Sequence, residues 1–279
     1  MAIIFAQIVG VTAASLLVVA FGLHGLKRVG LASLTAWLSR APGLDGIILF
    51  FTTVPMVAGP IAGVRLLPEA NAWLAAGLGL VAAVLGQIIT VMVWTVAHEL
   101  AHRDAVRGPR IVHALNRSVG RVRNHTAVWW TALAVPVFSV IRIAEILLWP
   151  PLVWLVRFPR YNDAEWVNIS RHKFDGLVGH DLIWCLYCDW MTGIWSLGSE
   201  MLRNVESFWC PIRFDSAKKC ANCQTDFPDL ETRWIPADGT MAEVVEVLES
   251  HYKPTGTNTW FGHPARLTIE GEAVEPDAE

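Results

Sequence analysis

Residues 98 to 102 read His-Glu-Leu-Ala-His and end a long uncharged segment of the chain. On a helix, His98 and His102 are four residues apart and share one face. Two imidazoles on one face can bind a single metal ion, and Glu99 beside them can take a proton from a metal-bound water molecule. The spacing therefore predicts a metal site with two histidine ligands and Glu99 as the general base. The alternative is a pair of ordinary histidines at the edge of a membrane helix.

A catalytic zinc ion needs a third protein ligand. Candidates lie on both sides of the next apolar segment, and they are His125, Asp163, Glu165 and Asp175, with His172 and His180 flanking Asp175. Four other histidines show no partner in the sequence pattern, and we expect them to be ordinary surface or core residues: His24, His113, His251 and His263.

The motif resembles that of site-2-type intramembrane metalloproteases, which place H-E-x-x-H at the end of a transmembrane helix. Those enzymes add an aspartate from a later D-G motif that typically follows an asparagine. Asn168, Asp175 and Gly176 look similar to this second motif. The resemblance covers residues 72 to 185 and implies that Asp175 is the third ligand of a zinc ion. It also implies a membrane protein as substrate.

The same residues resemble a second group, the membrane desaturases and alkane hydroxylases. These enzymes open with a similar histidine box and hold two irons with about eight or more histidines. The order of histidines is similar in outline: His98 and His102, then His125, then His172 and His180. The H-x-x-H-H boxes are absent and the chain has nine histidines, so a full ligand set would need carboxylates. This resemblance implies iron and a lipid substrate.

Two C-x-x-C pairs, Cys185 with Cys188 and Cys220 with Cys223, are separated by 31 residues. Paired knuckles of this kind close a tetrahedron of thiolates around one metal ion. The spacing is similar to that of zinc ribbons and rubredoxins, and we prefer zinc over iron. The first pair could instead be buried structural cysteine. The fifth cysteine, Cys210, could replace a knuckle ligand, pack in a core or be reactive.

The composition indicates a membrane protein. Hydrophobic residues make up 53% of the chain and charged residues 17%, against about 25% charged in ordinary soluble domains. The formal net charge of -3 gives no sign of a nucleic-acid partner. Residues 2–22, 45–64 and 72–97 are each apolar enough to cross a bilayer, which takes about 20 residues.

Basic loops set the expected orientation. Arginines and lysines follow the first and third of these segments, so the N-terminus is expected outside and the His98 end in the cytoplasm. Residues 126–158 are apolar again, but they are too long for one straight span and contain Pro136, Pro150 and Pro151. We expect a tight or re-entrant hairpin there. It would return the chain to the cytoplasm.

The predicted architecture is mainly α. A polytopic helical domain with three to five membrane segments covers residues 1–158, and a small cytoplasmic cysteine-rich α+β domain covers 159–269. Helices are expected at 191–209 and from an N-cap at Thr240, and residues 270–279 form an acidic disordered tail.

The leading predicted function is a zinc-dependent metalloprotease acting in the bacterial inner membrane. The first alternative is a non-haem iron desaturase or hydroxylase of lipids, with the cysteines as an electron-transfer module. The second is a non-catalytic membrane scaffold with structural zinc. The oligomeric state stays open.

Overall fold

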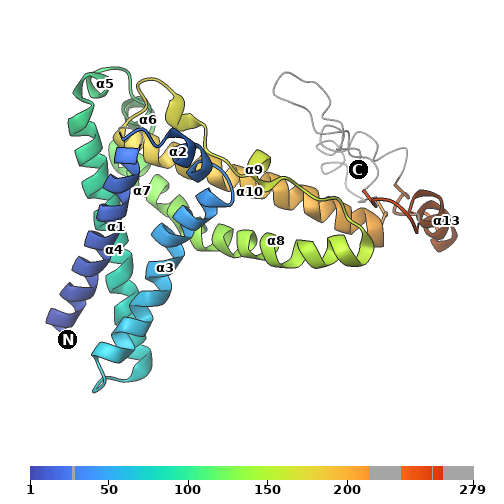
Figure 1. Cartoon of the computed structure of the whole chain (residues 1–279), viewed down its shortest axis with the longest axis horizontal. Coiled ribbons are helices and arrows are strands. Elements are labelled where there is room, and N and C mark those ends of the chain that lie inside the picture. The colour runs from blue at the N-terminus through green and yellow to red at the C-terminus, as the bar shows by residue number, and fades with distance from the viewer. Residues whose placement is uncertain (27–28, 214–233, 253, 260–279) are drawn as a thin grey trace. The chain divides into compact units, whose positions relative to one another are not determined.

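The computed structural model describes residues 1–26, 29–213, 234–252 and 254–259 (Figure 1). These ranges are mainly helical and contain two isolated bridges, Arg40 with Asn168 and Ile212 with Ile235, but no strand. The expectation of an α+β cysteine-rich domain is therefore not supported by the described residues. In the described part of residues 159–269, the regular elements are helices.

The chain divides into two compact units. Unit 1 comprises Met1–Ile143 and Asn162–Ser196, and unit 2 comprises Ala144–Tyr161 and Leu197–Glu279. The boundary predicted at residue 158 falls inside unit 2. The segment that follows it joins the membrane helices in unit 1.

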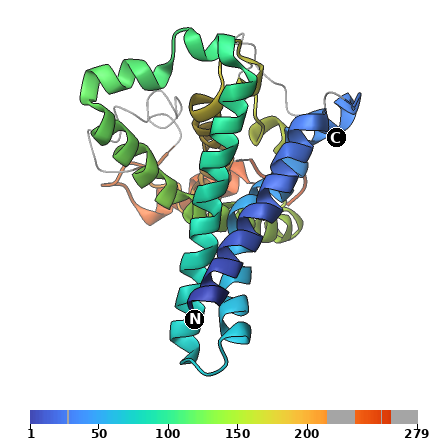
Figure 2. The same ribbon diagram turned by 90° about the vertical axis from the view of Figure 1, so that its left-hand side faces the viewer.

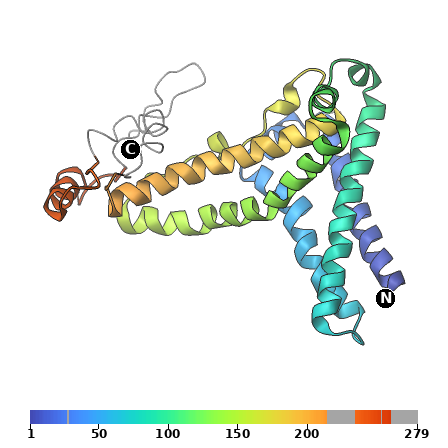
Figure 3. The same ribbon diagram turned by 180° about the vertical axis from the view of Figure 1, so that it is seen from behind.

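Three long helices form the centre of unit 1: α1 (Ala2–Leu26), α3 (Gly43–Leu66) and α4 (Ala72–Ala101). Each is long and apolar enough to cross a membrane, as predicted. α1 and α3 lie alongside α4 (Figures 1 and 3). Many of their outward side chains are apolar and exposed, which is the pattern expected when lipid is the solvent.

Small residues bring these helices into close contact. A Cβ atom added to Gly79 of α4 would meet the backbone of Gly59 in α3, and one added to Gly63 would meet the carbonyl of Ala75. A Cβ atom added to Gly86 of α4 would meet the side chain of Thr12 in α1. Lipid tails are as apolar as leucine, so membrane helices associate through such close backbone packing and not through a hydrophobic driving force.

A fourth apolar helical run follows, formed by α7 (Arg121–Thr131), the 3-10 turn η1 (Ala132–Ala134) and α8 (Val135–Val156). Together they make a stretch of 36 residues that is also long and apolar enough to cross a membrane. The tight or re-entrant hairpin predicted for residues 126–158 is not seen, because α8 runs from Val135 to Val156 without a break. Pro136 lies in the first turn of α8, where a missing N–H costs no helical bond. Pro150 and Pro151 lie inside α8 and do not end it.

Short elements gather at the end of α4 that carries His98 (Figures 1 and 2). They are α2 (Ala32–Leu38), α5 (Arg103–Arg107), α6 (Ile111–Val119), η2 (Arg171–Lys173) and the beginning of α10 (Gly179–Trp209). α9 (Asp163–Trp166) lies farther along α10, with the carbonyl of Trp166 close to Gly193. Backbone hydrogen bonds tie the segment before α10 to the α2–α3 connection, from Ala41 N to Val167 O and from Ile169 N to Ser39 O, both 2.9 Å.

Unit 2 contains the last parts of α8 and α10 together with α13 (Met241–His251). Phe158 packs between aromatic rings, with centroid distances of 5.2 Å to both Trp149 and Phe208. The predicted N-cap at Thr240 is confirmed: its side chain accepts from Glu243 N, and the Glu243 carboxylate accepts from Thr240 N. The helix predicted at 191–209 is also confirmed, as the second part of the longer α10.

Candidate metal centre

Three histidine rings lie together at one end of unit 1. His98 and His102 come from the last turns of α4, and their ring centroids are 4.3 Å apart. His24, near the end of α1, has its ring centroid 5.2 Å from that of His98 and 6.0 Å from that of His102. Trp94 stacks on His98 at 4.7 Å. We call His24, His98 and His102 the histidine cluster.

His24, for which the sequence showed no partner, has ring neighbours in the structure, His98 and His102. His24 lies 74 residues before His98, so no local spacing connects them. One weak signal was present in the sequence, because both residues close an apolar segment that is followed by basic residues. Because α1 packs against α4, the two similarly placed residues, His24 and His98, come into contact.

Hydrogen bonds fix the state of two ring nitrogens in the cluster. His102 Nδ1 lies 2.9 Å from the carbonyl oxygen of His98, so Nδ1 donates and the neutral ring keeps a lone pair at Nε2. His98 Nδ1 accepts from Gly179 N at 3.1 Å, so the neutral ring carries its proton at Nε2. In this tautomer the lone pair of His102 is at Nε2, whereas the lone pair of His98 at Nδ1 already accepts a hydrogen bond.

Glu99 is one member of a buried ion-pair network. Its Oε1 accepts from Arg110 Nη2 at 2.9 Å and from His180 N at 3.2 Å. Arg110 Nε in turn donates to Asp181 Oδ2 at 2.8 Å, and Asp181 Oδ1 accepts from Val112 N at 3.0 Å. The network joins the end of α4, the start of α6 and the start of α10. Because its charges are paired and hydrogen-bonded, it can exist in the interior.

The pKa values of the network follow from these contacts. Burial by itself would raise the pKa of Asp181, but neighbouring His180 and Arg110 outweigh burial and hold that pKa below its ordinary value. Burial by itself would lower the pKa of Arg110, but its hydrogen bonds to Glu99 and Asp181 raise it. Both groups therefore stay charged around neutral pH.

A second histidine pair lies at the start of α10. The rings of His125 and His180 meet edge to face, with centroids 5.1 Å apart. His180 Nδ1 is 3.7 Å from Asp181 Oδ1, which is an ion-pair distance and too long for a hydrogen bond. Gly179, next to His180, contacts His98. Two of the predicted ligands, His125 and His180, are thus brought together near the histidine cluster.

The other predicted ligands lie elsewhere. Asp175 and His172 are exposed in the segment before α10. Asp163 accepts from Arg142 at 2.7 Å, and Glu165 accepts from Asn162 at 2.9 Å. Within the described ranges, no three His, Cys, Asp or Glu side chains stand in a metal-binding arrangement as they lie. The structure gives no contact between the described Asp175 and either histidine of the motif.

The first C-x-x-C pair does not form a knuckle. Cys185 and Cys188 lie within the continuous helix α10, whereas a knuckle needs a tight turn. Cys185 is partly buried, which raises the pKa of its thiol, and Cys188 is exposed. Cys210 is exposed directly after α10. Cys220 and Cys223 lie outside the described residues, so the predicted four-thiolate site stays a prediction.

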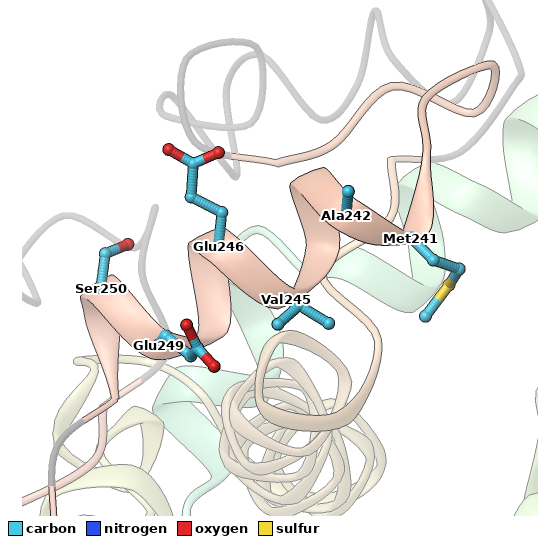
Figure 4. Close-up of a pocket in the computed structure, with 6 residues that line it drawn as sticks. All are labelled: Met241, Ala242, Val245, Glu246, Glu249 and Ser250. Carbon is cyan, nitrogen blue, oxygen red and sulfur yellow. The ribbon is translucent and has the colours of Figure 1, made fainter.

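Two hollows mark the described surface. One, of about 310 Å³, lies beside Glu99 and is lined by Val96, Glu99, Leu100, Arg103, Val106 and Arg107. The other, of about 780 Å³, lies along α13 and is lined by Met241, Ala242, Val245, Glu246, Glu249 and Ser250 (Figure 4). The α13 hollow has no imidazole or thiol in its lining. Of these two, the hollow beside Glu99 is the one that adjoins the H-E-x-x-H motif.

Comparison of the chain with models of protein families, with curated proteins and with solved structures found no match. Function must therefore be inferred from the geometry of the histidine cluster and its surroundings.

Proposed function

We propose that the protein is a membrane-embedded metalloenzyme whose metal ion is held by His24, His98 and His102. The observation that carries this proposal is the arrival of His24 from α1 beside the two histidines of α4. Imidazoles on one tetrahedral ion with metal–nitrogen bonds of about 2.0–2.1 Å have ring centroids roughly 5 Å apart. The three separations of 4.3, 5.2 and 6.0 Å bracket that value. The rings of His98 and His102 are stacked at an angle of 23°, so one of them must rotate before both nitrogens point at the same ion.

The hydrogen bonds of the cluster support His102 as a metal ligand, whereas His98 must give up a hydrogen bond before it can bind metal. Metal-binding histidines usually donate their second ring N–H to a carbonyl or carboxylate, as His102 does to His98 O. His98 must exchange its hydrogen bond from Gly179 N for the metal ion. Metal binding is therefore expected to move the first turn of α10.

For the reaction, we favour iron-dependent oxidation of a lipid substrate. Glu99, the base that hydrolysis would require, is committed to Arg110. His125 and His180 add two further imidazoles near the cluster, and imidazole is a suitable ligand for iron. Bound iron would supply one-electron and oxygen chemistry. The chain itself would supply the ligands, the apolar surroundings and the rigid network that holds them.

Zinc-dependent hydrolysis of a membrane protein is the second candidate, and one observation favours it. Arg110 and His180 N both bind Oε1 of Glu99, and among the described residues Oε2 accepts no hydrogen bond. Glu99 also lines the hollow of about 310 Å³. In this candidate the network orients the carboxylate, and Oε2 takes the proton of a water molecule.

The proposed location is the bacterial inner membrane, with the histidine cluster at the cytoplasmic face. The support for this orientation is the concentration of arginine near the end of α4, at Arg103, Arg107, Arg117, Arg121 and Arg123.

The test is the metal content per chain of the full-length protein purified in detergent. It should be compared with a His24→Ala variant and a His98→Ala, His102→Ala double variant. His113→Ala is the matched control, because His113 is an exposed histidine on nearby α6. A Cys220→Ser, Cys223→Ser variant separates metal bound by the cysteines. We expect the cluster variants to lose metal that His113→Ala retains.

The identity of the lost metal separates the candidates. Loss of iron supports the oxidase. Loss of zinc, together with hydrolysis that Glu99→Gln abolishes while metal stays bound, supports the hydrolase. A metal content that the cluster variants leave unchanged contradicts both and leaves a membrane scaffold.

A further inference from the structure

The fourth apolar run begins at the end of unit 1 that carries the histidine cluster. Asn124 Nδ2, in the first turns of α7, donates to Asn116 Oδ1 of α6 at 2.9 Å. The ring of His125 contacts that of His180 at the start of α10. The start of α7 is therefore fixed next to the cytoplasmic end of α4.

Arg142, well along α8, is fixed at the same end. Its Nε and Nη2 donate to the carboxylate of Asp45 at distances of 2.8 to 3.0 Å, and Nη2 also donates to Asp163 at 2.7 Å. Asp45 lies in the first turn of α3. α3 and α4 run antiparallel, joined by the turn at residues 67–71, so the first turn of α3 lies at the end where α4 finishes.

Helix length excludes a crossing between these two contacts. From Arg121 to Arg142, an α-helix advances about 30 Å at 1.5 Å per residue. The hydrocarbon core of a bilayer is also about 30 Å thick. A helix that crossed the membrane after Arg121 would carry Arg142 to the opposite face, away from Asp45. Arg142 and Asp45 do form an ion pair, and it is buried, with side-chain exposures of 2% and 5%. This contact is incompatible with a helix that crosses the membrane between Arg121 and Arg142.

In this run the polar side chains face inward and the apolar side chains face outward, which is the reverse of a surface helix on a soluble protein. The inward face carries buried Ser139 and Arg142. The outward face carries an apolar stripe at spacings of three and four residues: Trp130, Leu133, Val137 and Val140, which are 73%, 63%, 57% and 66% exposed. Arg121 and Arg123 are exposed at its beginning, where phosphate headgroups would lie.

We infer that residues 121–143 do not cross the bilayer but lie in the plane of its cytoplasmic leaflet, with the stripe of Trp130, Leu133, Val137 and Val140 among the acyl chains. Helices with one apolar face and basic flanks bind membranes in this orientation. Residues 162–196 then stay on the side of the membrane that carries the histidine cluster. This inference is independent of metal binding.

The first test measures depth. Spin labels are placed in full-length protein, reconstituted in vesicles of phosphatidylethanolamine and phosphatidylglycerol, at single positions: Trp130→Cys, Leu133→Cys, Val137→Cys and Val140→Cys. All four side chains are exposed, so folding should tolerate the labels. We expect equal immersion depths. A crossing helix would change depth by roughly 15 Å over these ten residues, at about 1.5 Å per residue, and that steady gradient would overturn the inference.

The second test measures sidedness with an impermeant maleimide on oriented membranes. Three exposed positions are compared as single cysteines: Glu69→Cys in the turn between α3 and α4, Arg107→Cys in α5 and Asp175→Cys before α10. The native cysteines are replaced by serine. Labelling of position 175 from the same side as position 107 supports the inference. Labelling of position 175 from the side of position 69 contradicts it.

Discussion

Arg110 Nη2 donates to Glu99 Oε1 at 2.9 Å, so the glutamate of the H-E-x-x-H motif is an ion-pair partner of a buried arginine. The same guanidinium donates from Nε to Asp181 at 2.8 Å. One arginine therefore connects the motif on α4 with the helix that follows the fourth apolar run. This connection makes the motif part of the structure of unit 1 as well as a candidate for chemistry.

Removal of Arg110 should destabilise the protein strongly. Arg110→Ala leaves the buried carboxylate of Asp181 without its cation, and breaking a buried pair in this way costs about 3–5 kcal/mol. The measurement is the free energy of unfolding in mixed detergent micelles, followed by helical circular dichroism. Arg107→Ala is the control, because its pair with Asp104 is exposed at 3.7 Å and should contribute less than about 1 kcal/mol. Equal effects of the two substitutions would contradict a structural role for the network.

Stability should also fall in acid because of Asp181. Its pKa in the folded protein lies below the ordinary value of 3.8, so folding favours the charged form. The stabilisation is complete above pH 3.8 and is lost as the pH falls further, through the folded-state pKa. Thermal unfolding of wild type and Asp181→Asn should therefore converge at low pH. A constant difference between them across that range would rule out this titration.

Close packing of α3 on α4 should be sensitive to one added methyl group. Gly79→Ala places a Cβ against the backbone of Gly59, and overpacking of this kind costs about 1–3 kcal/mol. Gly77→Ala, two residues earlier on α4, meets nothing within 4 Å. It should be neutral or stabilising by up to about 1 kcal/mol, since alanine favours helix over glycine. The unfolding free energies of the two variants in detergent test this difference.

Gly179 should tolerate a side chain less well than Gly176. Both have positive φ angles, +55° and +77°, so alanine is strained at either position. At Gly179 the added Cβ would also meet the Glu99 side chain, whereas at Gly176 it meets nothing within 4 Å. We expect Gly179→Ala to unfold at a lower temperature than Gly176→Ala. The reverse order would show that Glu99 is not held against the start of α10.

The three spans of the bundle could be predicted because lipid imposes a simple rule of length and apolarity. The Thr240 cap could also be predicted, since capping depends on residues three apart. The course of residues 126–158 could not, because it depends on the contact between Arg142 and Asp45, 97 residues apart. The knuckle at Cys185 was predicted wrongly, because C-x-x-C spacing fits a helix face as well as a turn.

The histidine cluster was predictable in part. His98 and His102 follow from the helical period, which is local. His24 depends on how α1 packs against α4, and these helices come close together at Gly86 and Thr12, which are small residues without a candidate role in chemistry. A motif search restricted to residues that can bind metal or catalyse a reaction does not include such positions.

The turn between α3 and α4 is short, and Asn71 closes it by accepting from Trp73 N at 2.9 Å. With residues 121–143 in the plane of one leaflet, this turn is the segment between α1 and α10, in the described part of the chain, that must pass through the hydrocarbon during biosynthesis. It carries one charge, Glu69, between residues 67 and 71. In this arrangement, the segment between α3 and α4 that would be translocated is a few residues long.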